Sequence, residues 1–176
     1  MVESTDIKES QTSLMKATSQ SLRMRKGERL HHRNAVEALF NRGKNEYAYP
    51  LRMFYLFVEE GGVSELLSPA AHSDVERLQM MVTVPKKKFK HAVDRVWLRR
   101  RIREAYRLNR LSLKDALSVD VRGRYLMLAF IYVGNEKAQF CTIEKKMLKL
   151  FDKLKAVMTT LSEDSVSGKT ISERDL

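Results

Sequence analysis

The sequence contains little cysteine, proline and glycine, and no long apolar run. Its 176 residues include one cysteine, three prolines and seven glycines. Cys141 has no partner for an internal disulfide, and no CxxC or Cys/His cluster with the spacing of a zinc site occurs. There is also no run of about eighteen apolar residues, and no apolar segment of signal-peptide length near the start. We therefore expect a cytoplasmic protein without disulfide, structural zinc or membrane span.

Constellations of catalytic residues are also missing. The histidines His31, His32, His72 and His91 are scattered, and none forms a pair near an acidic cluster. There is neither a nucleophile with a neighbouring base nor an acidic triad that would hold two magnesium ions. We therefore expect no catalytic residue and no metal site in the chain, and we interpret His31, His32 and His91 as contacts at the edge of a basic surface.

Positive charge is concentrated in one segment, residues 84–110. This segment has eleven Lys or Arg residues against Asp94 and Glu104, a local net charge of +9, whereas the whole chain carries +11. The isoelectric point is near 9.8. Each phosphate that such a surface neutralises releases condensed counterions and so favours association. The composition indicates a surface that binds a polyanion, with nucleic acid or an anionic membrane as the class of partner.

The basic segment also has the periodicity of an amphipathic helix. Its apolar residues recur at spacings of three and four: Leu98, Ile102, Ala105 and Tyr106. A step of 100° per residue places the arginines in one arc of roughly 100°, opposite or beside this stripe: Arg99, Arg100, Arg103, Arg107 and Arg110. A charged helix face is often merely solvated, but this one is nearly single-signed, with only Glu104 nearby to pair. We therefore predict a helix with one buried face and one phosphate-binding face.

The remaining pattern predicts a small α+β sandwich with the order α-β-β-α-β-α. The other expected elements are a helix at 34–42 that stops at Gly43, strands at 51–59 and 77–84, a loop at 60–74, a strand at 124–133 and a helix at 142–161. An additional short strand near Tyr47 is compatible with the pattern. The apolar continuity of residues 124–133 indicates a central strand that is covered on both faces. Residues 1–21 and 162–176 lack a hydrophobic period and are predicted to be flexible tails of a domain at 22–161.

Residues 84–107 resemble the hallmark segment of the bacterial ribonuclease P protein component. In that family, Ala-Val, a short gap and Arg-Asn-Arg precede alternating basic and aliphatic residues that lead to Arg-Glu-Ala-Tyr; this chain reads AVDRVWLRRRIREAYR. Outside this segment the likeness rests on scattered matches: Arg29 and Leu30, Phe40 and Gly43 in a short helix and its stop, Val84 at a strand end, and Lys86 and Lys87. The resemblance extends over about residues 22–161.

One part of the hallmark is missing. The positions of Arg-Asn-Arg hold Arg95, Val96 and Trp97, so the Asn and the second Arg are absent. An Asn side chain offers RNA both a donor and an acceptor, whereas Val96 offers neither. Trp97 either stacks on a base of the RNA or packs against a tail or a neighbouring loop, and the sequence leaves these alternatives open.

The resemblance implies a protein subunit of the ribonucleoprotein endonuclease ribonuclease P, which removes the 5′ leader from precursor tRNA. In that family the catalytic RNA subunit performs the hydrolysis with Mg²⁺, so the resemblance implies no catalytic residue or metal in the protein. The implied partners are this RNA and precursor tRNA. No membrane is involved, and no protein partner is required. The implied fold has a central mixed sheet, and a left-handed crossover inserts the basic helix between parallel strands. Arg95, Arg99, Arg100 and Arg103 match basic positions of the family. Together with Arg107 of the helix and the basic loop, they complete the predicted RNA-binding set: Lys86, Lys87, Lys88, Lys90, Arg95, Arg99, Arg100, Arg103 and Arg107.

The resemblance further implies a cleft between the sheet and the first helix, where relatives hold the single-stranded leader. The matching positions are Phe40 on the helix and Phe54 or Tyr55 on the strand, with Arg52 nearby. Aromatic stacking combined with attraction to the backbone tolerates any base, at about 1–3 kcal/mol per stacked base. Phe40 is also compatible with a place in the core, because its helix has other apolar residues on the same face.

Two other functions are compatible with a basic surface. A stand-alone RNA-binding or ribosome-associated protein would bind RNA tightly without affecting tRNA processing. A protein that reads DNA with its basic helix is disfavoured, because no zipper heptads and no second recognition element accompany this helix. An effect of the protein on the cleavage of precursor tRNA would therefore distinguish a ribonuclease P subunit from both of these alternatives.

Overall fold

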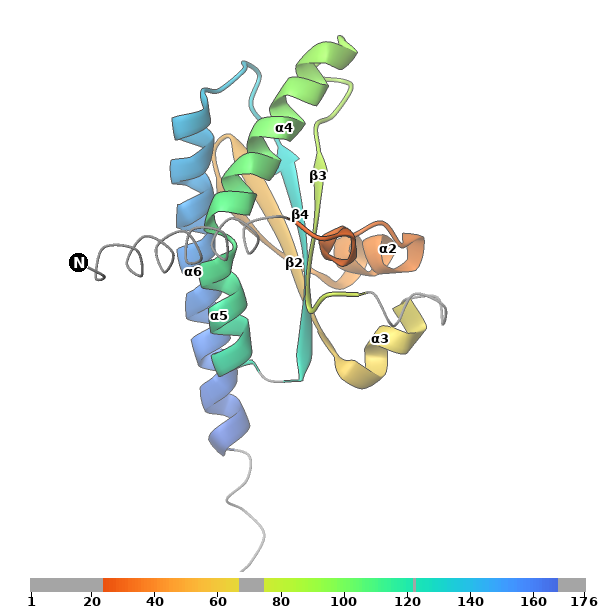
Figure 1. Cartoon of the computed structure of the whole chain (residues 1–176), viewed down its shortest axis with the longest axis vertical. Helices are drawn as coiled ribbons and strands as arrows, with labels where there is room; N and C mark the ends of the chain where they lie inside the picture. Colours follow the sequence, from red (N-terminus) through yellow and green to blue (C-terminus); the bar gives the residue numbers. More distant parts are fainter. Residues whose placement is uncertain (1–23, 67–74, 122, 168–176) are drawn as a thin grey trace, which may run out of the picture.

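A four-stranded sheet with helices on both faces makes up the described part of the chain, residues 24–66, 75–121 and 123–167 of a computed structural model (Figure 1). The strands are β1 (Lys44–Ala48), β2 (Leu51–Glu59), β3 (Leu78–Thr83) and β4 (Arg124–Tyr132). The helices are α2 (Arg33–Arg42), α3 (Glu60–Leu66), α4 (Ala92–Asn109), α5 (Leu111–Asp120) and α6 (Phe140–Ser167), and a short 3-10 helix, η1 (Lys26–Glu28), precedes α2. The predicted α+β class is confirmed.

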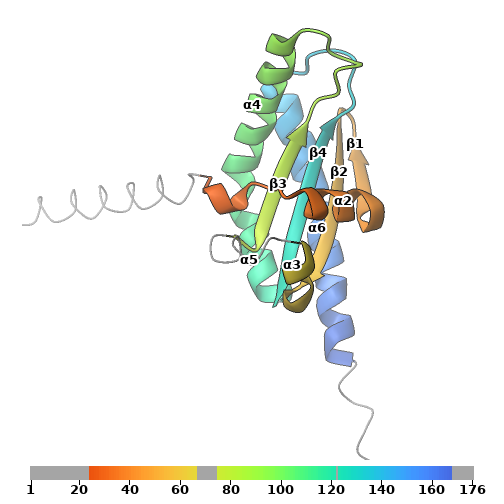
Figure 2. The same cartoon turned by 90° about the vertical axis from the view of Figure 1, so that its right-hand side faces the viewer.

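The sheet is mixed, with the strand order β1-β2-β4-β3. β2 runs antiparallel to both β1 and β4, whereas β3 and β4 are parallel and are joined through α4 and α5. In Figure 2 both parallel strands point upward, β4 lies to the right of β3, and α4 and α5 lie behind the sheet. This connection is left-handed, as the family resemblance implied, although right-handed crossovers are the general rule.

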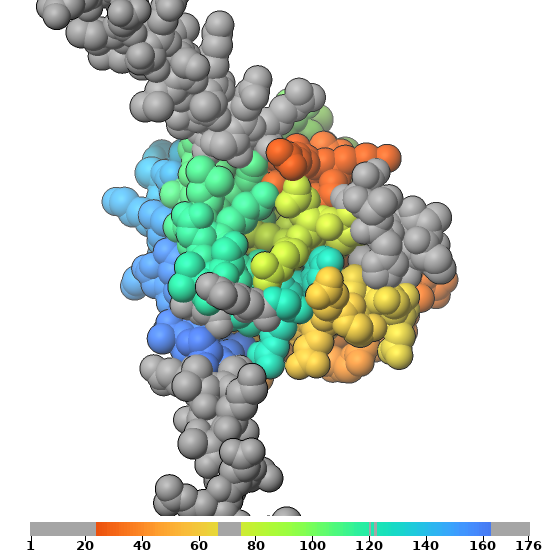
Figure 3. Space-filling model, turned by 60° about the horizontal axis from the view of Figure 1, so that its bottom comes forward, coloured from red at the N-terminus to blue at the C-terminus, as the bar shows by residue number. Residues whose placement is uncertain are grey.

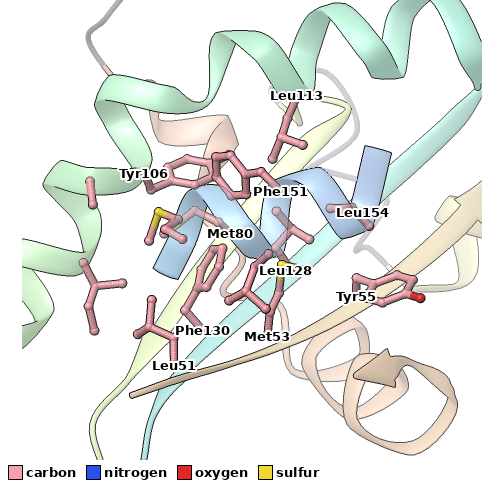
Figure 4. Close-up of a cluster of buried hydrophobic side chains, with 14 of the residues drawn as sticks. Leu51, Met53, Tyr55, Met80, Tyr106, Leu113, Leu128, Phe130, Phe151 and Leu154 are labelled. Atoms are coloured by element: carbon pink, nitrogen blue, oxygen red, sulfur yellow. The ribbon is translucent and has the colours of Figure 1, made fainter. Parts of the chain in front are cut away.

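Each face of the sheet contributes to a separate hydrophobic core. α4, α5 and α6 cover one face, and α2 and α3 cover part of the other (Figures 1 and 2). The main core lies under α4, α5 and α6, where Tyr106 of α4 and Phe151 of α6 pack on Phe130 of β4 (Figure 4). Along β4, alternate residues enter the main core and the smaller core under α2 and α3. The predicted central strand, covered on both faces, is therefore confirmed.

The basic helix ends well before Gly123, the next glycine in the chain. Its predicted stripe is confirmed, because Leu98, Ile102, Ala105 and Tyr106 are all buried. α4 ends at Asn109, however, and α5 starts at Leu111. The hydroxyl of Ser112 donates to the Asn109 carbonyl oxygen, 3.0 Å away, and so satisfies one of the carbonyls that the end of α4 leaves open. A side-chain contact of this kind lets a helix change direction without a glycine.

The predicted bounds of the first helix agree with the structure to within one residue, and the additional strand after it is present. α2 begins at Arg33, one residue before the predicted start, and stops at Gly43. A Cβ atom at Gly43 would lie 2.2 Å from the carbonyl oxygen of Leu39, so only glycine fits where the chain turns from α2 into β1. β1 is the additional short strand that includes Tyr47.

Two predicted boundaries are wrong. The predicted loop at 60–74 begins with α3, because burial of Val63 and Leu66 in the smaller core outweighs the low helix propensity of Gly61 and Gly62. The final helix was predicted to end at Leu161, but α6 continues to Ser167, into the predicted tail. The rest of that loop, residues 67–74, and of both predicted tails, residues 1–21 and 168–176, lies outside the described residues. Within the described ranges, every helix is too short or too polar to cross a membrane.

Candidate nucleic-acid interface

Contacts of Phe89 and Lys90 hold the C-terminal part of the basic loop between β3 and α4 in place. Phe89 is buried, and its ring centroid lies 5.7 Å from that of Tyr132. From the first turn of α4, the Nη1 atom of Arg95 donates hydrogen bonds to the carbonyl oxygens of Phe89 at 2.8 Å and Lys90 at 2.6 Å. Arg95 therefore fixes the loop against the helix.

The lysines of this loop are all exposed: Lys86, Lys87, Lys88 and Lys90. Lys88 is the one with partners among the described residues, because its Nζ atom donates to the carbonyl oxygen of Val133 and, at 2.9 Å, to Oδ1 of Asn135. Lys86, Lys87 and Lys90 have no such partner within the described ranges, so the loop presents three ammonium groups to the solvent. This arrangement can attract phosphates without a requirement for a defined base.

Three arginines from two distant segments gather on the side of α4 that faces η1. Arg99 and Arg103 lie one turn apart on α4, and Arg29 follows η1, where its backbone forms a parallel β-bridge with Met80 of β3. Burial, together with the charges of Arg99 and Arg29, lowers the pKa of the Arg103 guanidinium. We call these three residues the arginine cluster.

The arginine cluster lacks acidic partners. Within the described ranges, none of its three members, nor the neighbouring exposed Arg100, forms an ion pair. Guanidinium groups remain charged at physiological pH, so their proximity costs electrostatic repulsion. An anion bound between them would relieve this repulsion, and the planar fork of Arg suits the oxygens of a phosphate.

Two other arginines of the predicted cationic arc are engaged by carboxylates. Arg107 donates from Nε and Nη2 to the two oxygens of Glu104, at 2.9 and 2.7 Å. These bonds lower the pKa of the Glu104 carboxyl group and raise that of Arg107. Arg110 is only 1% exposed, and its Nη1 atom lies 3.3 Å from Oε2 of the fully buried Glu28. The placement of Arg110 on the exposed face is therefore wrong.

The burial of Arg110 follows from the way η1 packs on the molecule. Arg110 stands between α4 and α5, at the point where the helical wheel of α4 no longer applies. Nζ of Lys114 on α5 reaches the same carboxylate, 2.5 Å from Oε1 of Glu28. Figure 3 shows this end of the molecule, where β3 (lime) lies next to α5 (green) and to the segment of η1 and α2 (red and orange).

Trp97 packs against the protein. Its ring is half-buried at the edge of the main core, and the guanidinium carbon of Arg101 lies 3.3 Å from its centroid. Of the two alternatives left open by the sequence, this geometry favours packing, with Arg101 and the core edge as the neighbours. A base could stack on that ring face only after displacing Arg101, a cation that the ring itself attracts.

A second surface forms on the other face of the sheet, next to α2. The ring centroids of Phe40 on α2 and Phe54 on β2 are 5.1 Å apart at an interplanar angle of 66°. The guanidinium carbon of Arg52 lies 5.0 Å from the Phe54 centroid, and the same group donates to Oδ1 of Asn45 at 3.0 and 3.3 Å. Phe40 is 38% exposed, so it lies at the surface rather than in the core. We call Phe40, Arg52 and Phe54 the aromatic surface.

Tyr55 does not belong to the aromatic surface, which corrects the prediction of this residue as an alternative to Phe54. Successive side chains of a strand point to opposite faces, and Phe54 faces α2. Tyr55 is therefore in the main core, where it is 4% exposed (Figure 4). Burial, with a smaller contribution from Glu46, raises the pKa of its hydroxyl group.

The segment of η1 and α2 crosses the face of the sheet opposite the main core, from β3 towards β2 (Figure 2), and it therefore leads from Arg29 of the arginine cluster to Phe40 of the aromatic surface. The rings of His31 and His32 lie in this segment with centroids 4.2 Å apart, and burial together with His31 lowers the pKa of His32. This position fits the predicted edge of a basic surface. His91 stands just before α4, and His72 lies outside the described residues.

Sequence reasoning missed Arg29 as a site residue. Its Arg-Leu pair contributed to the family resemblance, but nothing local placed it next to α4.

A metal site is a separate question: within the described ranges, no three or more His, Cys, Asp or Glu residues come together in a group that could hold a metal ion.

Comparisons with known proteins agree on one family. The model of the family described as Ribonuclease P matches residues 24–155. A ribonuclease P protein component of Porphyromonas gingivalis is 39% identical over 124 residues, 70% of this chain and 80% of the relative. That of Chlorobium phaeobacteroides is 32% identical over 118 residues, 65% of this chain and 75% of the relative. The solved RNase P protein of Staphylococcus aureus, at 12% identity, has a similar fold, with a TM-score of 0.50 over 73% of this chain and 96% of that chain.

Proposed function

Because this chain belongs to the family of bacterial ribonuclease P protein components, we propose that it binds the catalytic RNA of ribonuclease P and the 5′ leader of precursor tRNA. The family indicates a subunit of a ribonuclease. In this proposal the RNA subunit cleaves the phosphodiester with its own Mg²⁺, and the protein contributes binding but no catalytic residue. The proposed holoenzyme is cytoplasmic and needs no second protein.

The arginine cluster carries the proposal for the RNA subunit. Three guanidinium groups without acidic partners among the described residues, together with the exposed lysines of the loop that precedes α4, match the dense charge of a folded RNA. The contacts belong to phosphates rather than bases, because the absence of the family Asn at Val96 removes a side chain that could read a base. Affinity for the RNA subunit should therefore depend strongly on salt.

The aromatic surface supports the proposal for the leader. Two partly exposed rings and one guanidinium group suit a single strand of variable sequence, because every base has a face that can stack. The surface is on the opposite side of the sheet from the main core, and the segment from Arg29 to Phe40 connects it to the arginine cluster. One protein could thus contact the ribozyme and the substrate strand at the same time.

The decisive experiment compares cleavage of precursor tRNA by the RNA subunit with and without the protein. The protein alone should cleave nothing, whereas its addition should lower the Mg²⁺ concentration that the RNA requires. Binding of precursor tRNA should strengthen more than binding of mature tRNA. Equal strengthening of both would exclude the role in leader binding, and tight RNA binding without any effect on cleavage would identify a stand-alone RNA-binding protein instead.

We expect Phe54→Ala to reduce the preference of the holoenzyme for precursor over mature tRNA by about tenfold, since one stacked base contributes about 1–3 kcal/mol. Affinity for mature tRNA should stay unchanged, because that ligand lacks the leader. Equilibrium binding of both tRNAs to the reconstituted holoenzyme measures this ratio. Phe57→Leu, on the opposite face of β2, is a control that should leave the ratio as it is. An unchanged ratio in Phe54→Ala would contradict the assignment.

A further inference from the structure

Tyr47 is an exposed aromatic residue on the same face of the sheet as the aromatic surface. It is 53% exposed. Its neighbours Glu46 and Ala48 face α6, since Glu46 pairs with Lys153 and Ala48 packs on the main core, so alternation turns Tyr47 to the opposite side. In the register of the two strands Tyr47 stands directly across from Arg52.

This register connects Tyr47 to the aromatic surface. Asn45 pairs with Phe54, and Tyr47 lies two residues further along β1, which makes it the diagonal neighbour of Phe54. Diagonal neighbours on one face are about 7–8 Å apart, a step that one nucleotide of an extended strand can span. Arg52 is the register partner of Tyr47, and its guanidinium carbon lies 5.0 Å from the Phe54 centroid.

Among the described residues, the smaller core contains no residue of β1, and the part of the sheet around Tyr47 carries no Asp or Glu on this face. The smaller core includes Phe54 and Ala129 but stops before Arg52 and its partner on β4, Ile131, which is half-buried. The four strands place no Asp or Glu side chain on this part of the face. Glu46 points to α6 on the other side of the sheet, and Glu59 is at the far end of β2. A nucleic-acid strand, with negative phosphates and flat bases, therefore meets two aromatic side chains and the cation of Arg52 on this part of the sheet, and the strands place no carboxylate beside them.

We propose that Tyr47 is a further base-stacking position for the single-stranded 5′ extension of the substrate, next in line after Phe54. This inference rests on the proposed function, because it extends the aromatic surface by one nucleotide. Arg52 binds the backbone phosphate between the two stacked bases. Tyr47 acts through its ring, so its hydroxyl group is dispensable.

The test measures affinity of the reconstituted holoenzyme for precursor tRNAs whose leaders increase one nucleotide at a time. Tyr47→Ala should weaken binding about fivefold or more for long leaders and leave mature tRNA unaffected. The leader length at which this loss first appears should differ by one or two nucleotides from the length at which the Phe54→Ala loss appears. Tyr47→Phe should bind like the unmodified protein.

A matched control is Tyr49→Ala. Tyr49 is also 53% exposed, but it lies in the turn after β1. It is near Tyr132, which faces the main core: burial raises the pKa of the Tyr132 hydroxyl group, and Tyr49 adds to this effect. We expect no dependence on leader length for Tyr49→Ala. Circular dichroism should show that the Tyr47 and Tyr49 variants are folded, because neither tyrosine belongs to a core.

The outcomes separate the inference from the proposed function. If Phe54→Ala shows a loss that depends on the leader and Tyr47→Ala does not, the inference is wrong and the proposed function stands. A loss in Tyr47→Ala that is equal for precursor and mature tRNA also overturns it, since that result indicates contact with another part of the RNA. If neither variant responds to the leader, the proposed leader binding fails and the inference fails with it.

Discussion

Replacing Arg99 and Arg103 together by alanine will weaken binding of the RNA subunit on the order of a hundredfold. Each guanidinium group is expected to form charge-assisted hydrogen bonds with phosphate, and such bonds contribute about 1.5–3 kcal/mol each. The slope of the logarithm of the binding constant against the logarithm of salt concentration should also fall by about two, one for each lost phosphate contact. Titrations of the RNA subunit at several salt concentrations measure both effects.

Lys145 and Lys149 on α6 provide the matched control for this prediction. They are exposed and one helical turn apart, so their replacement by alanine removes the same two positive charges from another surface. We expect a much smaller loss of affinity, because only general attraction is reduced. Equal losses for the two pairs would show that net charge, rather than the arginine cluster, governs RNA binding. Thermal unfolding should be similar in both double variants, since none of the four side chains is in a core.

Replacing Glu28 by alanine will lower the free energy of unfolding by about 3–5 kcal/mol, the usual cost of removing one partner from a buried ion pair. Glu28 is fully buried, and its carboxylate faces both Arg110, at 3.3 Å, and Lys114, at 2.5 Å. Without the Glu28 carboxylate, the buried guanidinium group of Arg110 loses a neighbouring negative charge. The midpoint of thermal unfolding should fall on the order of 10 °C for a domain of this size.

Two further variants identify the cause of this destabilisation. Arg25→Ala removes one side of an exposed pair with Glu76, in which Arg25 is 79% exposed, and should change the unfolding free energy by less than about 1 kcal/mol. The double variant Glu28→Leu with Arg110→Met removes both buried charges and should be more stable than Glu28→Ala. A Glu28→Ala protein as stable as Arg25→Ala would show that the buried pair contributes little to the fold.

Glu28 also has a consequence for the site. It immediately precedes Arg29, whose guanidinium group belongs to the arginine cluster. The buried contacts of Glu28 with Arg110 and Lys114 hold the η1 segment against the end of α4, and they thereby hold Arg29 beside Arg99 and Arg103. The Glu28→Ala protein should consequently bind the RNA subunit more weakly even at temperatures at which it is folded.

Features whose determinants lie within a few residues of one another could be predicted from the sequence. The spacing of Leu98, Ile102 and Tyr106 identified the buried face of α4, and the continuous apolar run of β4 identified the central strand. Gly43 marked the end of α2 because no side chain fits there. α3 was missed for the opposite reason, since its glycines suggested a loop and its stability comes from packing against distant residues.

The sequence by itself determined a basic amphipathic helix, its buried stripe and, through a family hallmark, the fold to which that helix belongs. Only the tertiary structure decided which cations stand together. It buries Arg110 beside Glu28 and brings Arg29 to Arg103, and the same packing turns Tyr55 into the main core. These outcomes depend on contacts between segments far apart in the chain. Local periodicity carries no information about such contacts, because it records only which side of one element is apolar.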